Sequence, residues 1–455
     1  MENTISRQIA KFAINLKYKD LPDNVVYEVK RYLYDSIGCA YGGYHTKDVN
    51  ILYNIYKNIG GKPEATIIGF GDKLPAVNVS LVNSLMIRAL DFNDIYWKED
   101  PSHPSDLIPA ALSVGEIQNA DMKDVIVAIV LAYEFEQRMS EFAVPGVRER
   151  GWHHGTITQF VSPLVAGKLL GLNEEEMVNA IGINACHNYT IGCPTAGKLT
   201  MMKNTVDPMA VQSGVFAALM AKNGYTGTEA IFEGKEGFMD VFGPDWSEEK
   251  LIGGLGEKFK ILECGMKAFP TEALTHTHIT ATLKTVTEND IKPEDIEEVR
   301  ITAISKAVDI LFDKSKYEIN SRETADHSLP YCVARAIIDR KITTESFDNN
   351  KLTDPLLKDM IYKIKGEASE KFEKMFPAKQ PSQVVVRTKN GKEYKTYLEY
   401  PKGDPREPMT IEDLSNKFNS LSAKLLSRDR QEKIKNTIFN CENISAQGFM
   451  KELIV

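Results

Sequence analysis

The chain has 455 residues, more than one hydrophobic core usually supports, so two domains are predicted. Hydrophobic residues make up 43% of the sequence and charged residues 26%, proportions typical of a globular protein. The net charge of −8, without a long basic run, argues against nucleic acid as the main partner, although a local group of cations can still bind a small anionic substrate.

The targeting features and the cysteines indicate a cytoplasmic protein. The N-terminal residues lack the charged-then-apolar pattern of a signal peptide, and no apolar run approaches the length of a membrane span. The six cysteines are scattered without a CxxC pair, which fits free thiols in a reducing compartment. We therefore expect no membrane association and no zinc or iron–sulfur framework built from cysteines.

The first half of the chain is predicted to be helical. Residues 25–40 carry apolar groups at helical spacing, and residues 125–140 and 160–172 are the clearest later helices. Pro163 is expected near the start of the last of these, where proline is tolerated. The glycine-punctuated segment 65–72 is not a dinucleotide-binding fingerprint, because no GxGxxG follows a strand.

Strand patterns appear in the second half of the chain. Residues 296–307 alternate apolar and polar side chains, as expected of a half-buried strand. Segments 383–388 and 393–400 flank Asn390-Gly391, the strongest hairpin signal in the sequence.

The order of these elements predicts a discontinuous domain. Helical segments at 326–339 and 355–364 accompany the strands, so residues 267–400 are expected to form a small α+β unit. Residues 1–266 and 401–455 are expected to form one larger helical domain from both chain ends.

The stretch from Ala89 to Ala110 is the most unusual in the sequence, because it is polar and lies between helix-like apolar segments. Its acidic residues and histidine are Asp91, Asp94, Glu99, Asp100, His103 and Asp106. Pro101 and Pro104 bias it away from helix. Polar loops on rigid supports often carry function. The alternative is that Asp91 and Asp106 merely cap helices in a surface loop.

Six of the eight histidines lie in polar segments next to Gly, Pro, Thr or Asp: His103, His153, His154, His276, His278 and His327. A lone histidine is usually an ordinary core or surface residue, but six in such settings favour a shared cleft.

The adjacent histidines His153 and His154 precede a helix and stand between Gly151 and Gly155, which permit close backbone approach. Two adjacent histidines in regular structure do not face one ligand, so only one of the pair is expected to be chemical. A third metal ligand is absent nearby in sequence, and no metal site is predicted.

Other candidate residues lie at predicted helix starts. Lys203 stands at the entrance of the helix around 211–221, where the helix macrodipole opposes a cation, so it points to a carboxylate ligand or else to a solvated lysine. His276 shares a helix face with apolar residues while His278 points elsewhere, so His276 is the buried candidate. At His327, the alternative to chemistry is helix capping by a neighbouring Asp or Ser.

Several motifs, in this order, resemble the MmgE/PrpD family. They are Ala-Leu-Asp-Phe-Asn-Asp (89–94) with His-Pro-Ser-Asp (103–106), Gly-Trp-His-His-Gly-Thr (151–156), Lys203 ahead of Gly-Val-Phe-Ala-Ala-Leu (214–219), Lys-Ala-Phe-Pro (267–270), and Ala-Asp-His-Ser-Leu-Pro-Tyr (325–331). The family includes 2-methylcitrate dehydratase, cis-aconitate decarboxylase and iminodisuccinate epimerase.

The resemblance implies a large all-α domain, a smaller α+β lid, a homodimer and a cofactor-independent lyase or isomerase with its site between the domains. By this resemblance Asp91, His103, one of His153 and His154, Lys203 and Lys267 line the site, and Tyr317 matches a lid tyrosine. We expect the catalytic residues to be Asp91, His103, His153, His154 and Lys203. The expected substrate-binding residues are Lys267 and Tyr317, from the resemblance, and His276, from its place on the buried helix face.

The expected reaction is dehydration of a 2-methylcitrate-like hydroxy di- or tricarboxylate. A neutral histidine or Asp91 takes the proton, the lysines offset the developing charge, and His103 protonates the departing hydroxyl. Ile95 stands where some relatives have threonine, which disfavours the decarboxylase, whereas segment 201–208 departs from the dehydratase pattern. The alternatives are a cis-aconitate-type decarboxylase, an iminodisuccinate-type epimerase, and a non-catalytic dimer that binds a carboxylate.

Overall fold

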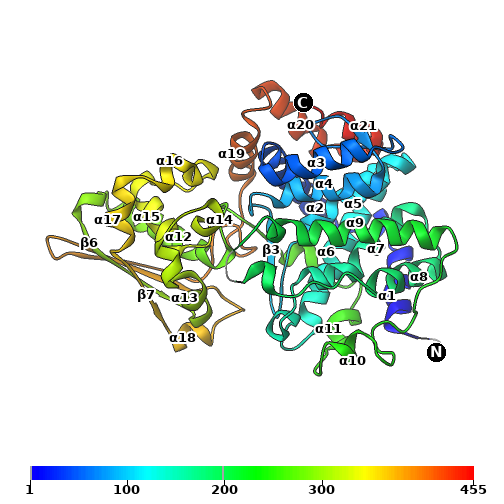
Figure 1. Cartoon of the computed structure of the whole chain (residues 1–455), viewed down its shortest axis with the longest axis horizontal. Coiled ribbons are helices and arrows are strands. Elements are labelled where there is room, and N and C mark those ends of the chain that lie inside the picture. The colour runs from blue at the N-terminus through cyan, green and yellow to red at the C-terminus, as the bar shows by residue number, and fades with distance from the viewer. Residues whose placement is uncertain (1–2, 197–198) are drawn as a thin grey trace. The chain divides into compact units, whose positions relative to one another are not determined.

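The computed structural model describes residues 3–196 and 199–455, and this part of the chain is mainly helical. It contains 21 α-helices, whereas its sheets are small. The predicted fold class, mainly α, is therefore confirmed. The chain divides into two compact units (Figure 1): unit 1 holds the described residues of Met1–Gly197, Met201–Cys264 and Ile411–Val455, and unit 2 holds Gly265–Thr410 with those of Lys198–Thr200.

Unit 1 is built from helices of both chain ends. In chain order they are α1 (Ile5–Asn15), α2 (Asp23–Gly43), α3 (Lys47–Ile59), α4 (Ala76–Arg88), α5 (Ile108–Gln118), α6 (Met122–Phe142), α7 (Gly155–Leu170), α8 (Glu174–Ala185), α9 (Met202–Lys222), α10 (Phe238–Val241), α11 (Glu248–Ile252), α19 (Ile411–Ser422), α20 (Arg428–Phe439) and α21 (Ala446–Lys451). Two short antiparallel pairs join β1 (Ala65–Thr66) to β2 (Lys73–Leu74) and β3 (Asp94–Trp97) to β4 (Pro101–Ser102).

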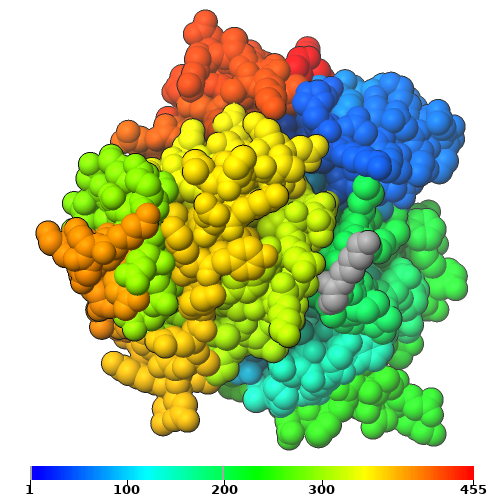
Figure 2. Space-filling model, turned by 60° about the vertical axis from the view of Figure 1, so that its left-hand side comes forward, coloured from blue at the N-terminus to red at the C-terminus, as the bar shows by residue number. Residues whose placement is uncertain are grey.

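The C-terminal helices of unit 1 pack against its N-terminal ones. Helices α19 and α20 both contact α2, and Figure 2 shows the C-terminal segments beside the N-terminal segments on the surface. The rings of Tyr34 and Phe418 stack with centroids 4.5 Å apart. An aromatic pair of this kind stabilises the contact beyond the area it buries.

Helix α7 begins earlier than the sequence predicts, at Gly155, so the expectation that Pro163 lies near a helix start is wrong. Pro163 has no N–H to donate to the carbonyl of Gln159, one turn before it. The side-chain amide of Asn184, from α8, donates to that carbonyl at 2.6 Å. A tertiary hydrogen bond thus replaces the missing helical one.

Helices α7 and α9 cross closely because small residues face each other. A side chain at Gly214 would place its Cβ 2.0 Å from Oγ of Ser162, and that hydroxyl donates to the carbonyl of Ala210 at 2.9 Å. The close crossing fixes the first turn of α9 relative to the start of α7, where His153 and His154 lie.

Unit 2 contains a four-stranded sheet in the order β7-β6-β8-β9. Its strands are β6 (Ile296–Ala303), β7 (Ile364–Ala368), β8 (Ser382–Thr388) and β9 (Glu393–Leu398), after the short β5 (Gly265–Met266). Its helices are α12 (His276–Glu288), α13 (Ser305–Leu311), α14 (Arg322–Ala325), α15 (Leu329–Asp339), α16 (Asn349–Leu352), α17 (Pro355–Ile361) and α18 (Glu370–Glu373).

The predicted hairpin around Asn390-Gly391 is confirmed by the antiparallel pairing of β8 and β9. Gly391 has φ +85°, a conformation that glycine adopts without steric cost. The predicted strand at 296–307 is confirmed as far as Ala303 but is too long, because the chain enters α13 at Ser305. Among the described residues, no helix has both the length and the apolar character to span a bilayer.

Candidate active site

The polar stretch after α4 folds back into unit 1 and is mostly buried. Helix α4 ends at Arg88, and Asp91 follows with φ +50°, a left-handed conformation that aspartate tolerates. The N–H of Asp91 donates to the carbonyl of Arg88 at 3.0 Å, which turns the carboxylate back toward the arginine. The alternative that Asp91 and Asp106 merely cap helices is wrong, because Asp91 pairs with cations and Asp106 accepts from the Asn93 amide at 3.1 Å.

Asp91 is shared between two buried cations. Arg88 places Nη1 2.5 Å from Oδ1, and Lys203 places Nζ 3.1 Å from Oδ2. Lys203 is the second residue of α9 and is 5% exposed. The alternative of a solvated lysine at this helix entrance is therefore wrong.

Arg88 joins three carboxylates. Besides Asp91, its Nε lies 3.6 Å from Oδ2 of Asp106 and 3.8 Å from Oδ2 of Asp207. Burial works to lower the pKa of Arg88, but the three carboxylates together raise it, so the guanidinium stays charged. Burial raises the pKa of Asp106 well above its usual range, more than Arg88 lowers it. Arg88 and Lys203 are the two cations beside Asp91, and Arg88 is also the cation beside Asp207.

His103 is held in one tautomer by the backbone of the same loop. Its Nδ1 lies 2.7 Å from the carbonyl oxygen of Asp94, which only accepts hydrogen bonds, so Nδ1 carries the hydrogen and the lone pair of the neutral ring is on Nε2. The side chain of Asp94 accepts from the backbone and hydroxyl of Ser105 at 2.9 and 2.6 Å. Burial raises the pKa of Asp94 to about 6 despite these hydrogen bonds.

Both His153 and His154 belong to this buried group, and the expectation that only one of the pair is chemical stays a prediction. Their ring centroids are 3.9 Å apart, and the rings of His154 and His103 are 5.4 Å apart. Neither residue is inside regular structure: His153 precedes α7 and His154 is its N-cap. A Cβ on Gly155 would meet Val206 at 2.6 Å, so glycine here permits the close approach to α9.

The two adjacent rings differ in their neighbours. Gly155 donates its N–H to Nδ1 of His153 at 2.9 Å, so the hydrogen of neutral His153 is on Nε2. Burial and then the neighbouring His154 lower the pKa of His153 well below its usual range, so this ring is neutral. His154 places Nε2 3.3 Å from Oδ2 of Asp207. Burial alone would raise the pKa of Asp207, but His154 and Arg88 lower it further than burial raises it, so Asp207 is ionised.

His153, His154 and Asp207 offer ligand atoms within 4.8 Å of one another, which is the geometry of a candidate metal site. The sequence did not predict this, because Asp207 is far away along the chain. However, Arg88 already supplies a cation 3.8 Å from Oδ2 of Asp207. A divalent ion at the same carboxylate would meet the repulsion of the buried guanidinium.

The three predicted substrate-binding residues belong to unit 2. Lys267 is 2% exposed, and His276 is 3% exposed with Nε2 3.3 Å from the carbonyl of Thr271. Tyr317 donates its hydroxyl to the carbonyl of Ile364 at 3.2 Å.

The expectation that His278 points away from the buried helix face is wrong. It is buried as fully as His276, and its Nδ1 lies 2.6 Å from Oγ of Ser382 in β8. Burial lowers the pKa of His278 to about 3, so it is a neutral core residue. At the next candidate, Ser328 accepts from the N–H of Tyr331 and caps α15, so the capping alternative near His327 is confirmed.

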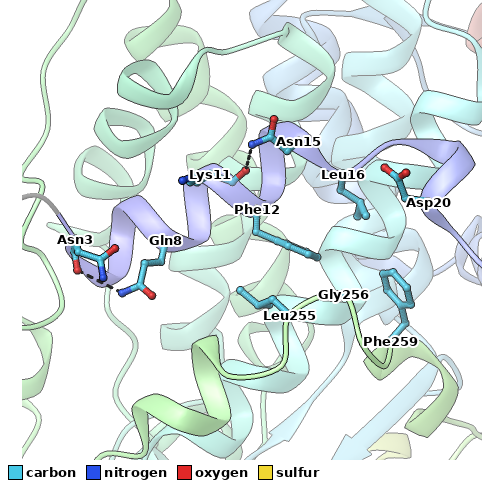
Figure 3. A pocket seen from close by; sticks show the side chains of 10 residues that line it. All are labelled: Asn3, Gln8, Lys11, Phe12, Asn15, Leu16, Asp20, Leu255, Gly256 and Phe259. Atoms are coloured by element: carbon cyan, nitrogen blue, oxygen red, sulfur yellow. Dashed lines mark hydrogen bonds between the residues drawn. The ribbon is translucent and has the colours of Figure 1, made fainter.

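Two of the hollows on the described part of unit 1 are not lined by the predicted site residues. The larger, about 580 Å³, lies between α1 and segment 255–259 (Figure 3), where Phe12, Leu255 and Phe259 form an apolar floor. The second, about 490 Å³, lies beside α9 and segment 187–190. The group around Arg88 is instead buried inside unit 1.

Sequence reasoning missed Arg88 and Asp207, which hold this group together. The available signals were a lone arginine in the apolar run of α4 and an aspartate before Pro208 in α9. Buried charges require partners, so each signal predicts an ion pair, but neither names the partner.

Family models and known proteins match most of the chain. The model of the MmgE/PrpD N-terminal domain matches residues 7–249, and that of the C-terminal domain matches residues 269–443. Cis-aconitate decarboxylase of Aspergillus terreus is 24% identical, covering 99% of this chain and 96% of that protein. Human cis-aconitate decarboxylase is 24% identical, with 100% and 95% covered. The 2-methylcitrate dehydratase of Escherichia coli is 24% identical, with 79% and 77% covered. The chain therefore belongs to the MmgE/PrpD family.

Proposed function

We propose that the protein is a cofactor-independent hydro-lyase that dehydrates a 2-methylcitrate-like hydroxy di- or tricarboxylate. The observation that carries the proposal is a chain of buried contacts: Lys203 pairs with Asp91, and Arg88 links Asp91 to Asp207. Asp207 lies beside His154, whose ring is next to that of His103. Ordered histidines beside charges balanced by buried cations are what proton transfer next to a carboxylate requires. Relatives named 2-methylcitrate dehydratase support this reaction class.

Lys203 is the proposed cation that offsets the negative charge developing on the substrate. The carbon next to a carboxylate is a weak acid, so a cation must offset the negative charge that develops as the proton leaves. Asp91 is poorly suited to take that proton, because Arg88 and Lys203 already stabilise its ionised form. A neutral imidazole is the better base.

We assign the base to Nε2 of His103, because the Asp94 carbonyl holds the hydrogen on Nδ1. This reverses the acid role expected for His103 from the sequence. The C–H bond breaks, its electron pair forms the C=C bond, and the C–O bond to the hydroxyl breaks. His154 gives from Nδ1 the proton that converts the departing hydroxide to water, and it keeps the hydrogen on Nε2 beside Asp207. Each proton transfer contributes about 10²–10⁴-fold to the rate.

The test is turnover of 2-methylcitrate, citrate and shorter hydroxydicarboxylates, followed by the ultraviolet absorbance of the unsaturated product. We expect product with the wild type and with His187→Gln, which changes an exposed histidine, and none with His103→Gln. Deuterium exchange or inversion without unsaturated product would replace the dehydratase by an epimerase. Thermal stabilisation by these acids without turnover would indicate a non-catalytic carboxylate-binding protein. Lys267, His276 and Tyr317 stay predicted substrate-binding residues, whose variants should raise KM.

A second candidate function is decarboxylation of cis-aconitate. It is favoured by coverage, since the decarboxylase of Aspergillus terreus aligns with 99% of the chain and the dehydratase of Escherichia coli with 79%. In this reaction a C–C bond breaks, carbon dioxide leaves, and an imidazolium protonates the carbon that keeps the electron pair. Release of carbon dioxide from cis-aconitate distinguishes it from dehydration, which releases none.

We also propose a homodimer, as membership of this family implies. Met202, Met209 and Phe216 recur every seven residues on α9 and are 41%, 48% and 56% exposed, so one face of the helix presents apolar side chains. A second copy of the chain is the proposed occupant of this face. Sedimentation velocity should show a dimer for the wild type and a monomer for Phe216→Glu. A wild-type monomer would contradict the proposal.

A further inference from the structure

We propose that Asp207, held by Arg88, is a positioning residue that keeps the hydrogen of neutral His154 on Nε2 and its lone pair on Nδ1. The inference rests in part on the proposed function, because it says how one of the proton-transfer groups is oriented. Its structural part, the tautomer of His154, does not depend on which substrate is turned over.

The geometry around Asp207 supports this role. Its side chain is buried, and its neighbours include His154 Nε2 at 3.3 Å from Oδ2 and Arg88 Nε at 3.8 Å from the same oxygen. Neither carboxylate oxygen, nor Nε2 of His154, makes a hydrogen bond of good geometry to a described residue, so the contact between them is a close approach of two buried polar atoms. An ionised carboxylate only accepts, so it favours a hydrogen over a lone pair on the nearby ring nitrogen. Asp207 therefore selects the tautomer, and Arg88 keeps Asp207 charged.

The consequence is a set of three imidazoles with different, fixed orientations. The Asp94 carbonyl places the lone pair of His103 on Nε2, and the Gly155 N–H places the hydrogen of His153 on Nε2. Asp207 completes the set by placing the lone pair of His154 on Nδ1. A fixed tautomer matters because a ring that presents the wrong nitrogen neither takes nor gives a proton at the reacting atom.

Close packing of α7 on α9 maintains the contact. Gly155 brings the start of α7 so near that a Cβ there would lie 2.9 Å from Oδ1 of Asp207. The crossing at Ser162 and Gly214 fixes the same two helices further along. The carboxylate thus has little freedom to move away from His154.

The direct test is ¹⁵N spectroscopy of histidine-labelled protein without substrate, with the His154 signal assigned by its loss in His154→Gln. We expect the Nε2–H tautomer in the wild type and a measurable fraction of the Nδ1–H tautomer in Asp207→Asn, because an amide both donates and accepts. The matched control is Glu134→Gln, which neutralises a buried carboxylate paired with Arg138 at 2.6 Å and should leave the His154 signal unchanged. An unchanged tautomer in Asp207→Asn would overturn the proposal.

The kinetic test asks whether Asp207 acts through His154. We expect Asp207→Asn to lower kcat by about 10²-fold or more with KM changed less than about threefold. The double variant Asp207→Asn/His154→Gln should be no slower than His154→Gln alone, whereas additive losses would overturn the proposal. If Asp207→Asn does not fold, Asp207→Glu retains the charge but displaces the carboxylate, and the same spectroscopy applies. If no acid is turned over, the proposed function fails while the tautomer result still decides this inference.

Discussion

The Nζ atom of Lys203 lies 3.1 Å from Oδ2 of Asp91, which joins the first turn of α9 to the end of α4. Replacing this cation in Lys203→Met should lower kcat/KM by about 10²-fold or more, because the charge that develops on the substrate is no longer offset. Steady-state kinetics with the acid that the wild type turns over measures the effect. Lys222→Met, at the other end of α9, is the control and should keep kcat/KM within about twofold. Near wild-type kcat/KM in Lys203→Met would remove the lysine from the mechanism.

Removal of the buried guanidinium should destabilise the fold. Arg88→Gln leaves Asp91 and Asp207 buried with one cation fewer, so the free energy of unfolding should fall by about 3–5 kcal/mol. Urea unfolding at pH 7 measures the change. Arg300→Gln, which breaks a half-exposed pair with Glu393 on the sheet of unit 2, should cost at most about 1 kcal/mol. If Arg88→Gln lowered the free energy of unfolding by no more than Arg300→Gln does, then water or a local rearrangement would be stabilising the buried carboxylates in place of the guanidinium.

Local sequence patterns predicted the elements of the fold better than its contacts. The hairpin at Asn390-Gly391 was predictable because turn type and strand alternation are local properties. The start of α7 was not, because the carbonyl of Gln159 that Pro163 leaves without its helical partner is satisfied by Asn184, which is a tertiary contact.

The same division applies to the candidate site. Asp91 and His103 stood out because a polar loop between apolar helices is locally unusual. Arg88 and Asp207 did not, since an ion pair between α4 and α9 depends on how helices pack. The close approach of the His153 and His154 rings was not predicted, for a related reason. The two rings lie outside regular structure, where the alternation of side-chain directions does not apply.

The crossing of α7 and α9 predicts a packing effect. Gly214→Ala would place a Cβ 2.0 Å from Oγ of Ser162, so the helices must separate and the free energy of unfolding should fall by about 1–3 kcal/mol. Ser162→Gly in the same chain removes that hydroxyl and should restore part of the loss. The restoration is partial because the backbone carbon of residue 162 also lies 2.7 Å from the new Cβ. Full tolerance of Gly214→Ala would show that the crossing has room to adjust.

Chelation should not affect the protein. Arg88 occupies the cationic position beside Asp207, so His153, His154 and Asp207 do not need an ion. We expect dialysis against EDTA to leave activity and Tm unchanged, and elemental analysis to find far less than one transition-metal ion per chain. Activity that is lost on dialysis and restored by zinc would instead identify the three residues as a metal site.

Glu136 predicts how stability depends on pH. Its side chain in α6 is buried, and Oε1 accepts from the hydroxyl of Thr158 at 2.7 Å. Burial raises the pKa of Glu136 to about 8 in spite of that hydrogen bond. Because the folded state binds the proton more tightly than the unfolded state, whose carboxyl titrates near 4.5, Glu136 causes stability to fall as the pH rises from about 4.5 to about 8.

Glu136→Gln mimics the protonated side chain and keeps the acceptor for Thr158. The variant should therefore gain on the wild type as the pH rises, by about 2–5 kcal/mol between pH 5 and pH 8, since each unit of pKa shift corresponds to about 1.4 kcal/mol. Urea unfolding of both proteins at each pH gives the difference directly. A difference that does not change with pH would mean that Glu136 is ionised in the folded protein, and that a cation or water stabilises it inside α6.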